Sequence, residues 1–211
     1  MKYITVLLSA LMGIMLSAAV PATDALDDPM ADYAIVDIEW NVRVSPDRND
    51  TVIGTIQDVV KHLSIVDPVG FAALNKSIND ASDDGPSHHS YNILNMYNPT
   101  DYYCNVYDGM ADGPAIKTGI KYLRHVDGTP GQGPGPSTCG RVSCSWDSAI
   151  WWCNHNNESI GLDSYTRIAD GAQNLVDSCA FAQDDNTPGD FNGEQVFEGG
   201  WAVVVRKNIG C

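Results

Sequence analysis

Basic residues are scarce in this sequence. Its 211 residues include 12 lysines and arginines against 27 aspartates and glutamates, and the formal net charge is −15. The few basic residues form no cluster, whereas proteins that bind nucleic acids or anionic membranes concentrate positive charge on one surface. Charge therefore argues against both classes of partner, and the negative field favours solubility or a cationic partner.

Long apolar runs are lacking beyond the beginning of the chain. Lys2 precedes an apolar run over 4–16, and small residues follow up to Ala22. This is the layout of a secretory signal peptide. A membrane anchor is the alternative, but a spanning helix needs about twenty apolar residues. We expect residues 1–22 to be a signal peptide, with no transmembrane segment and a secreted, extracellular mature protein.

Cysteine is lacking from the first half of the chain. An even number of cysteines in an exported protein predicts disulfides, here three, and their pairing stays open because six cysteines allow fifteen connectivities. No finger-like spacing with histidine points to zinc. The cysteines, all beyond residue 103, are Cys104, Cys139, Cys144, Cys153, Cys179 and Cys211.

Three Asn-x-Ser/Thr sequons fit an exported glycoprotein. They begin at Asn49, Asn75 and Asn157. In a eukaryotic secretory pathway such sites accept N-linked glycans, so all three are candidate glycosylation sites.

The sequence contains few motifs that indicate catalysis. The sequence has no G-x-S-x-G elbow, and paired cysteines would leave no free thiolate. The adjacent His88 and His89 lack a spaced third metal ligand. Asp37 and Glu39 lie on the same face of one predicted strand, which is typical of its solvent-facing side, although a carboxylate pair could serve glycoside hydrolysis. We predict no catalytic residue, metal or cofactor.

The N-terminal part predicts a strand, a short second strand over 51–53 and then a helix. Apolar residues alternate with polar ones over 33–44, which indicates one half-buried strand. Apolar residues then recur at helical spacing over 55–64. The polar stretch 79–90 is a loop or linker. We expect residues 23–98 to form a strand-helix layer and residues 99–211 to form the disulfide-stabilised part.

Residues 99–211 predict the element order β-α-β-β-α-β-β. Strands are expected near 101–107, 140–146, 148–154, 195–198 and 201–206, with helices over 114–125 and 165–181. This order favours an α+β fold, an antiparallel sheet with two helices on one face in a split β-α-β sandwich.

Two of these strands have no polar face. In 148–153 and 201–206, both sets of alternating residues are apolar, so the sheet should be covered on both sides. We expect the N-terminal strand-helix layer to cover the second face. The alternative is that Trp151 or Trp152 lines an exposed aromatic surface for a ligand or partner.

The cysteine-bearing half contains the runs CGRVSCSWDSAIWWCNHN, SYTRIADGAQNLVDSC and VFEGGWAVVVRKNIGC. In cysteine order and element order, residues 101–211 resemble small secreted proteins of filamentous fungi. They also resemble the killer-toxin family of smut fungi and the necrosis-inducing effector family of leaf-infecting fungi. The resemblance implies an α/β sandwich with split β-α-β units and a role in antagonising another organism's cells. It carries over no catalytic residue.

The resemblance also suggests a binding residue. The killer toxins are basic and are thought to act on calcium channels through a lysine; here Lys207, beside Arg206, is the comparable candidate in an acidic chain. We expect a secreted effector or toxin-like virulence protein that binds a host or competitor protein or cell-surface component. An extracellular hydrolase with a carboxylate site is one alternative. The other is a wall- or carbohydrate-binding protein with exposed Trp151, Trp152 and Trp201.

The cysteine layout generates a stability prediction. Each bridge that closes a loop of tens of residues should stabilise the folded state by about 3–4 kcal/mol in the chain-entropy picture. Dithiothreitol should therefore lower the melting temperature and loosen residues 101–211. An unchanged melting temperature after complete reduction would show that the cysteines are not three structural bridges.

Overall fold

A computed structural model describes residues 30, 33–80, 97–181 and 187–211. The predicted signal peptide at 1–22, the His88–His89 pair and most of the predicted loop over 79–90 lie outside the described residues. Within the described part, no helix combines the length and apolar character needed to cross a membrane.

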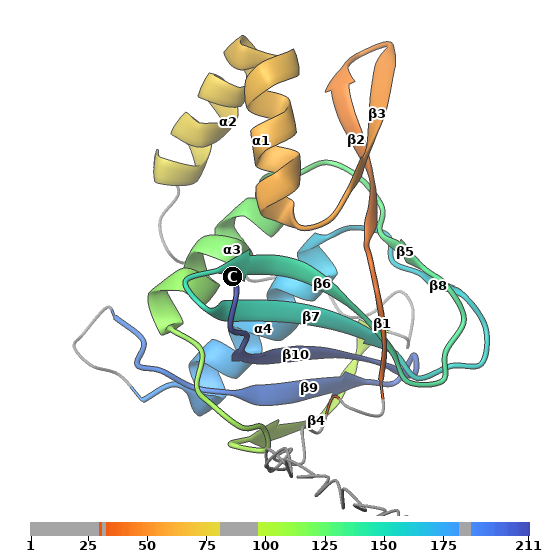
Figure 1. The fold of residues 1–211 in the computed structure, drawn as a ribbon, viewed down its shortest axis with the longest axis vertical. Coiled ribbons are helices and arrows are strands. Elements are labelled where there is room, and N and C mark those ends of the chain that lie inside the picture. Colours follow the sequence, from red (N-terminus) through yellow and green to blue (C-terminus); the bar gives the residue numbers. More distant parts are fainter. Residues whose placement is uncertain (1–29, 31–32, 81–96, 182–186) are drawn as a thin grey trace, which may run out of the picture.

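The main sheet has six strands in the spatial order β1-β6-β7-β10-β9-β4 (Figure 1). β1 pairs parallel to β6, and the other four pairings are antiparallel. The central strands β7 and β10 are rich in β-branched and aromatic residues, which suit a buried pleated surface. The strand bounds are Ala34–Val36, Thr138–Ser145, Ser148–Asn154, Trp201–Lys207, Gly193–Phe197 and Pro99–Cys104 in that spatial order.

Helices α3 (Gly113–His125) and α4 (Thr166–Cys179) cover one face of this sheet. The Asp112 side chain caps α3 by accepting a hydrogen bond from the backbone N–H of Ala115 at 2.8 Å. Ile120 of α3 and Leu175 of α4 are among the buried residues that pack onto the sheet. The α+β class with two helices on one face is confirmed. The sheet is mixed and not wholly antiparallel as expected, because the N-terminal strand β1 joins its edge parallel to β6.

The predicted order of elements in residues 99–211 is also found. It corresponds to β4-α3-β6-β7-α4-β9-β10, and a short pair formed by β5 (Gly131–Gln132) and β8 (Ile160–Gly161) is added to it. β5 lies in a segment rich in Gly and Pro, and both strands are two residues long, which is too short to show a period-two pattern.

The expected single strand over 33–44 is two strands. β1 joins the main sheet, whereas β2 (Glu39–Ser45) forms a separate hairpin with β3 (Arg48–Ile53). The chain leaves the sheet because Trp40 points into the helix-side core, stacks on Tyr165 at 4.2 Å and donates its indole N–H to the Gly54 carbonyl at 2.8 Å. α1 (Ile56–Val66) follows, and α2 (Pro68–Asp80) was not predicted.

The N-terminal strand-helix layer lies on the helix side of the sheet, not on the second face as expected. Trp40, Ile56 and Val59 share one apolar core with Trp152. Ile38 packs directly over Gly140, where a side chain would lie 2.1 Å from the Ile38 Cδ1 atom. Because the two backbones approach this closely, the chain can cross over β6 after β1 ends. α1, α2 and the β2–β3 hairpin lie at the top of Figure 1.

The three predicted disulfides are present, and the structure gives their pairing. Cys104–Cys179 joins β4 to α4, and Cys139–Cys153 crosses between β6 and β7. Cys144–Cys211 ties the end of β6 to the C-terminal residue. The last bridge holds the segment after β10 against the sheet.

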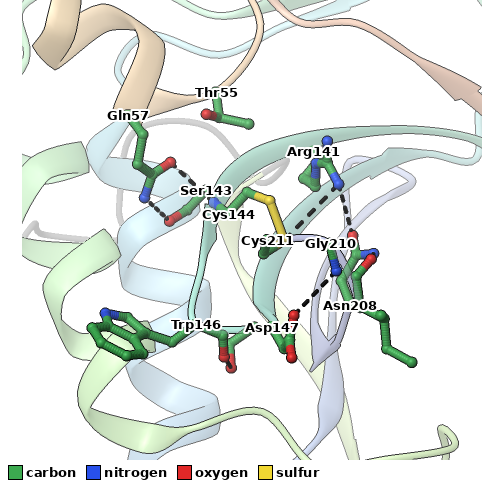
Figure 2. Close-up of a disulfide and its surroundings, with 12 residues drawn as sticks. Thr55, Gln57, Arg141, Ser143, Cys144, Trp146, Asp147, Asn208, Gly210 and Cys211 are labelled. Atoms are coloured by element: carbon green, nitrogen blue, oxygen red, sulfur yellow. Dashed lines mark hydrogen bonds between the residues drawn. A yellow bond between two sulfur atoms is a disulfide. The ribbon is translucent and has the colours of Figure 1, made fainter.

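Gln57 connects α1 to the sheet (Figure 2). Its side chain donates to the Ser143 hydroxyl and accepts from the Cys144 backbone N–H, both at 3.0 Å.

Gln57→Ala leaves the Cys144 N–H without its partner, so the free energy of unfolding should fall by about 1–3 kcal/mol. Urea denaturation measures the change, and Lys61→Ala, on an exposed position of the same helix, should change it by less than about 0.5 kcal/mol. Equal values for the two variants would contradict a stabilising role for this contact.

Candidate functional site

The second face of the sheet carries a hollow that brings together Trp151 and Lys207, two of the residues singled out from the sequence. Trp152 points to the opposite face and is completely buried among the helices. Successive side chains of a strand alternate between faces, so neighbouring tryptophans cannot line one site.

This hollow, the Trp151 groove, has a volume of about 490 Å³. That volume falls within the range of small-ligand sites, about 300–1,000 Å³. Trp151 is 8% exposed and belongs to the small apolar core of the second face. The lining residues are Met30, Ile35, Asp108, Gly109, Trp151, Arg206, Lys207, Asn208 and Ile209.

Positive charge gathers around this groove. Arg206 and Lys207 line it, and the guanidinium of Arg141 lies over the Trp151 ring, 5.8 Å from its centre. Arg141 also donates to the Asn208 side-chain oxygen at 3.0 Å. The chain has only 12 basic residues and a net charge of −15, so two arginines and one lysine around one apolar floor make this surface more positive than the chain as a whole.

The loop that precedes α3 forms one wall of the groove. Gly109 has a φ of +76°, and a side chain there would lie 3.0 Å from the Lys207 Cβ and Cδ atoms. The missing side chain thus lets the loop pack on the aliphatic stem of Lys207, which leaves its ammonium group at the exposed rim.

The Asn192 side chain binds the backbone of this loop at Tyr107 and was not identified from the sequence. It is fully buried, accepts from the Tyr107 N–H at 3.1 Å and donates to the Tyr107 carbonyl at 2.8 Å. Nothing in the sequence distinguishes this asparagine from those in the surrounding polar stretch, because its role depends on a loop 85 residues away.

Tyr107 lies beneath the same wall. Burial first, and then the Glu194 carboxylate, raise the pKa of the Tyr107 phenol above its usual value. The phenol stays protonated, donates a hydrogen bond to Glu194, and has Arg206 over its ring at 5.7 Å. The result is a rigid, neutral support beside the basic rim.

Several carboxylates of the described part have structural partners. Asp50 bonds to Arg48 and His62, and these contacts lower the pKa of its carboxyl. Asp58 belongs to the capping box of α1, and Asp170 pairs with Arg124. The expected strand carboxylates, Asp37 and Glu39, are exposed and line no described hollow. Among the residues the structure describes, no group of three or more His, Cys, Asp or Glu side chains could hold a metal ion.

The three sequons occupy different surroundings. Asn49 and Asn157 are exposed, which suits glycan attachment. Asn75 on α2 is half-buried and accepts from the Tyr122 hydroxyl at 3.5 Å. None of the three lines the Trp151 groove.

The raised pKa of Tyr107 predicts how the stability of the protein changes at alkaline pH. Because the pKa of Tyr107 is raised on folding, its contribution to stability is complete below the ordinary tyrosine value of 10.0 and is lost as the pH rises above it. The melting temperature should therefore fall less steeply above pH 10 in Tyr107→Phe than in the unaltered protein. Tyr102→Phe, at a half-exposed position, is the control, and identical profiles for all three proteins would contradict the assignment.

Function has to be inferred from the residues of this chain. No protein-family model matches it, and neither does any curated protein or any solved structure. The resemblance of residues 101–211 to the killer-toxin and necrosis-inducing families therefore stays an expectation, and the Trp151 groove is the candidate site that the geometry provides.

Proposed function

We propose that this chain is an exported, disulfide-stabilised effector or toxin-like protein that acts by binding a molecule of a host or competing organism. The observation that carries the proposal is the Trp151 groove, where an apolar floor lies beside the cationic side chains of Arg206 and Lys207. Export rests on the signal-peptide layout of residues 1–22 and on the three disulfides, which persist in oxidising compartments.

The groove suits a ligand that combines an apolar group with a negative charge. Ile35 and Ile209, 56% and 80% exposed, offer apolar surface to such a ligand. Beneath them the buried Trp151 ring is already held in place by its neighbours, so little side-chain entropy is lost at the floor on binding. Arg206 and Lys207 complement an anionic group at the rim. A basic rim also lessens the repulsion between such a ligand and an otherwise acidic protein.

The alternatives considered from the sequence have less support. A carboxylate-based hydrolase needs two acids facing one cleft, and the Trp151 groove contains the single carboxylate of Asp108. A platform of Trp151, Trp152 and Trp201 is unsuitable because all three are at most 8% exposed. Binding through the groove is the function that the geometry supports best.

The proposal predicts that the activity depends on the charge of the groove. Purified protein infiltrated into plant leaf, or applied to competing fungi, should cause a response that Lys207→Glu weakens by about tenfold or more, because a rim charge is inverted. Lys61→Glu, an equal change on the exposed side of α1, should leave the response unchanged.

Two outcomes would contradict the proposal. The first is the absence of any response to the unaltered protein in both leaf and fungal assays. The second is an equal effect of Lys207→Glu and Lys61→Glu, which would assign the activity to overall charge and not to the groove. Circular dichroism of both variants checks that they are folded.

A further inference from the structure

The three disulfides differ in how far solvent reaches them. Cys139 and Cys153 are completely buried, and Cys179 is 6% exposed. Cys144 and Cys211 are both half-buried, and together they border an open hollow of about 520 Å³ at the surface. A thiol in solution can therefore reach either sulfur of the Cys144–Cys211 bridge, and such access is one condition for thiol–disulfide exchange.

A cation lies beside one of these two sulfur atoms. The guanidinium of Arg141 donates to the Cys211 sulfur at 3.9 Å (Figure 2). When a disulfide is cleaved, one sulfur leaves as a thiolate, and a thiol of lower pKa leaves faster. A neighbouring arginine lowers the pKa of a thiol. Cys211 is therefore the better leaving group, and Cys144 is the sulfur that an incoming thiolate attacks.

The same bridge holds one wall of the Trp151 groove. β10 ends at Lys207, and the segment after it, residues 208–211, returns to the end of β6 through the Cys144–Cys211 bond. Asn208 and Ile209 of this segment line the groove. Whatever frees Cys211 therefore acts directly on the shape of the groove.

Hydrogen bonds to the Trp146–Asp147 turn also hold this segment. The Asn208 N–H donates to the Asp147 carbonyl at 2.6 Å, and the Gly210 N–H donates to the Asp147 carboxylate at 3.1 Å. The turn lies in solvent, since Trp146 is 82% exposed and its indole points away from the bridge (Figure 2). Water replaces such exposed bonds at little cost, so a chain end held by them alone should fray.

From these observations we propose that the Cys144–Cys211 bridge is a thiol-sensitive switch for the Trp151 groove. In an oxidising extracellular space the bridge stays intact and the groove keeps its wall. In a reducing compartment, small thiols cleave the bridge, residues 208–211 come away from the sheet, and the affinity of the groove for its ligand falls. This inference rests on the proposed binding function of the groove, because the bridge can regulate only a site that binds.

The exchange consumes two molecules of a small thiol for each bridge. The first, as a thiolate, attacks the Cys144 sulfur and forms a mixed disulfide with it, while Cys211 leaves as a thiolate beside Arg141. The second attacks the small-molecule sulfur of the mixed disulfide, which releases Cys144 and one small-molecule disulfide. Two electrons pass from the small thiols to the bridge, and their two protons pass to the cysteines.

Differential alkylation of the intact, oxidised protein tests the chemical step. The protein is incubated with reduced glutathione, quenched with N-ethylmaleimide and mapped by peptide mass spectrometry. Cys144 and Cys211 should be alkylated faster than the other four cysteines by about tenfold or more, because access controls the exchange. Equal rates for all the cysteines, or faster reduction of another bridge, would overturn the proposal.

Substitution of Arg141 tests the assignment of the leaving group. Arg141→Gln can still donate to Asn208 but has no charge, so reduction of the bridge should slow by about threefold or more. Arg141→Lys should restore most of the rate. Arg43→Gln, which removes a charge from an exposed position of β2, is the control and should leave the rate unchanged. An unchanged rate in Arg141→Gln would contradict the departure of Cys211 as the thiolate.

Binding of 8-anilinonaphthalene-1-sulfonate, which combines apolar rings with an anionic group, tests the effect on the groove. Isothermal titration should show binding to the oxidised protein. The double variant Cys144→Ser/Cys211→Ser should bind about tenfold more weakly or worse, because the contacts of residues 208–211 are lost. Cys104→Ser/Cys179→Ser, which removes the bridge between β4 and α4, is the matched control and should keep the affinity. Circular dichroism shows whether both double variants are folded.

These measurements separate the switch from the proposed function. If the oxidised protein does not bind the sulfonate, or if Lys207→Glu binds it equally well, the groove is not the binding site and the switch is overturned with it. If the oxidised protein binds through the groove but the Cys144→Ser/Cys211→Ser variant binds equally well, the proposed function stands and only the switch is overturned.

Discussion

The apolar character of both faces of β7 and β10 is the constraint on which the rest of the structure depends. Ile150 and Val203 point to the helix side, whereas Trp151 and Val204 point to the other. Neither face can be left in water, because each strand would then expose a continuous apolar surface. Helices α3 and α4, together with the N-terminal layer, cover the first face and form one large apolar core with it.

Among the residues that the structure describes, the second face is covered by much less. Its apolar core includes single residues such as Met30 and Tyr107, packed with Cys211 at the chain end. A thin cover made of short segments leaves a hollow over Trp151, and this hollow is the candidate binding site. The groove is therefore a consequence of how unequally the two faces are covered.

The segment after β10 links the Trp151 groove to the Trp146–Asp147 turn. Asn208 and Ile209 line the Trp151 groove, and the N–H groups of Asn208 and Gly210 brace the Trp146–Asp147 turn. The Cys144–Cys211 bridge fixes this segment. One disulfide thus supports two separate surfaces at the same end of the sheet.

The sequence was informative wherever periodicity and capping acted locally. Alternation predicted the strands around Trp152 and Val203, and Pro114 at a first helical turn predicted the start of α3. It was less informative about α2, whose short apolar stripe contains one fully buried residue, Ile78. The break between β1 and β2 was missed because the same alternation continues through it.

By itself, the sequence determined that Trp151 and Trp152 face opposite sides and that six cysteines can form three bridges, because strand alternation and cysteine number are local properties. Only the tertiary structure decided which side received the helices, which cysteines paired, and that Trp146 stays in solvent. These outcomes depend on contacts between residues far apart in the chain, such as Ile38 against Gly140 and Cys144 against Cys211. Residue patterns show what must be buried, but they do not show what will cover it.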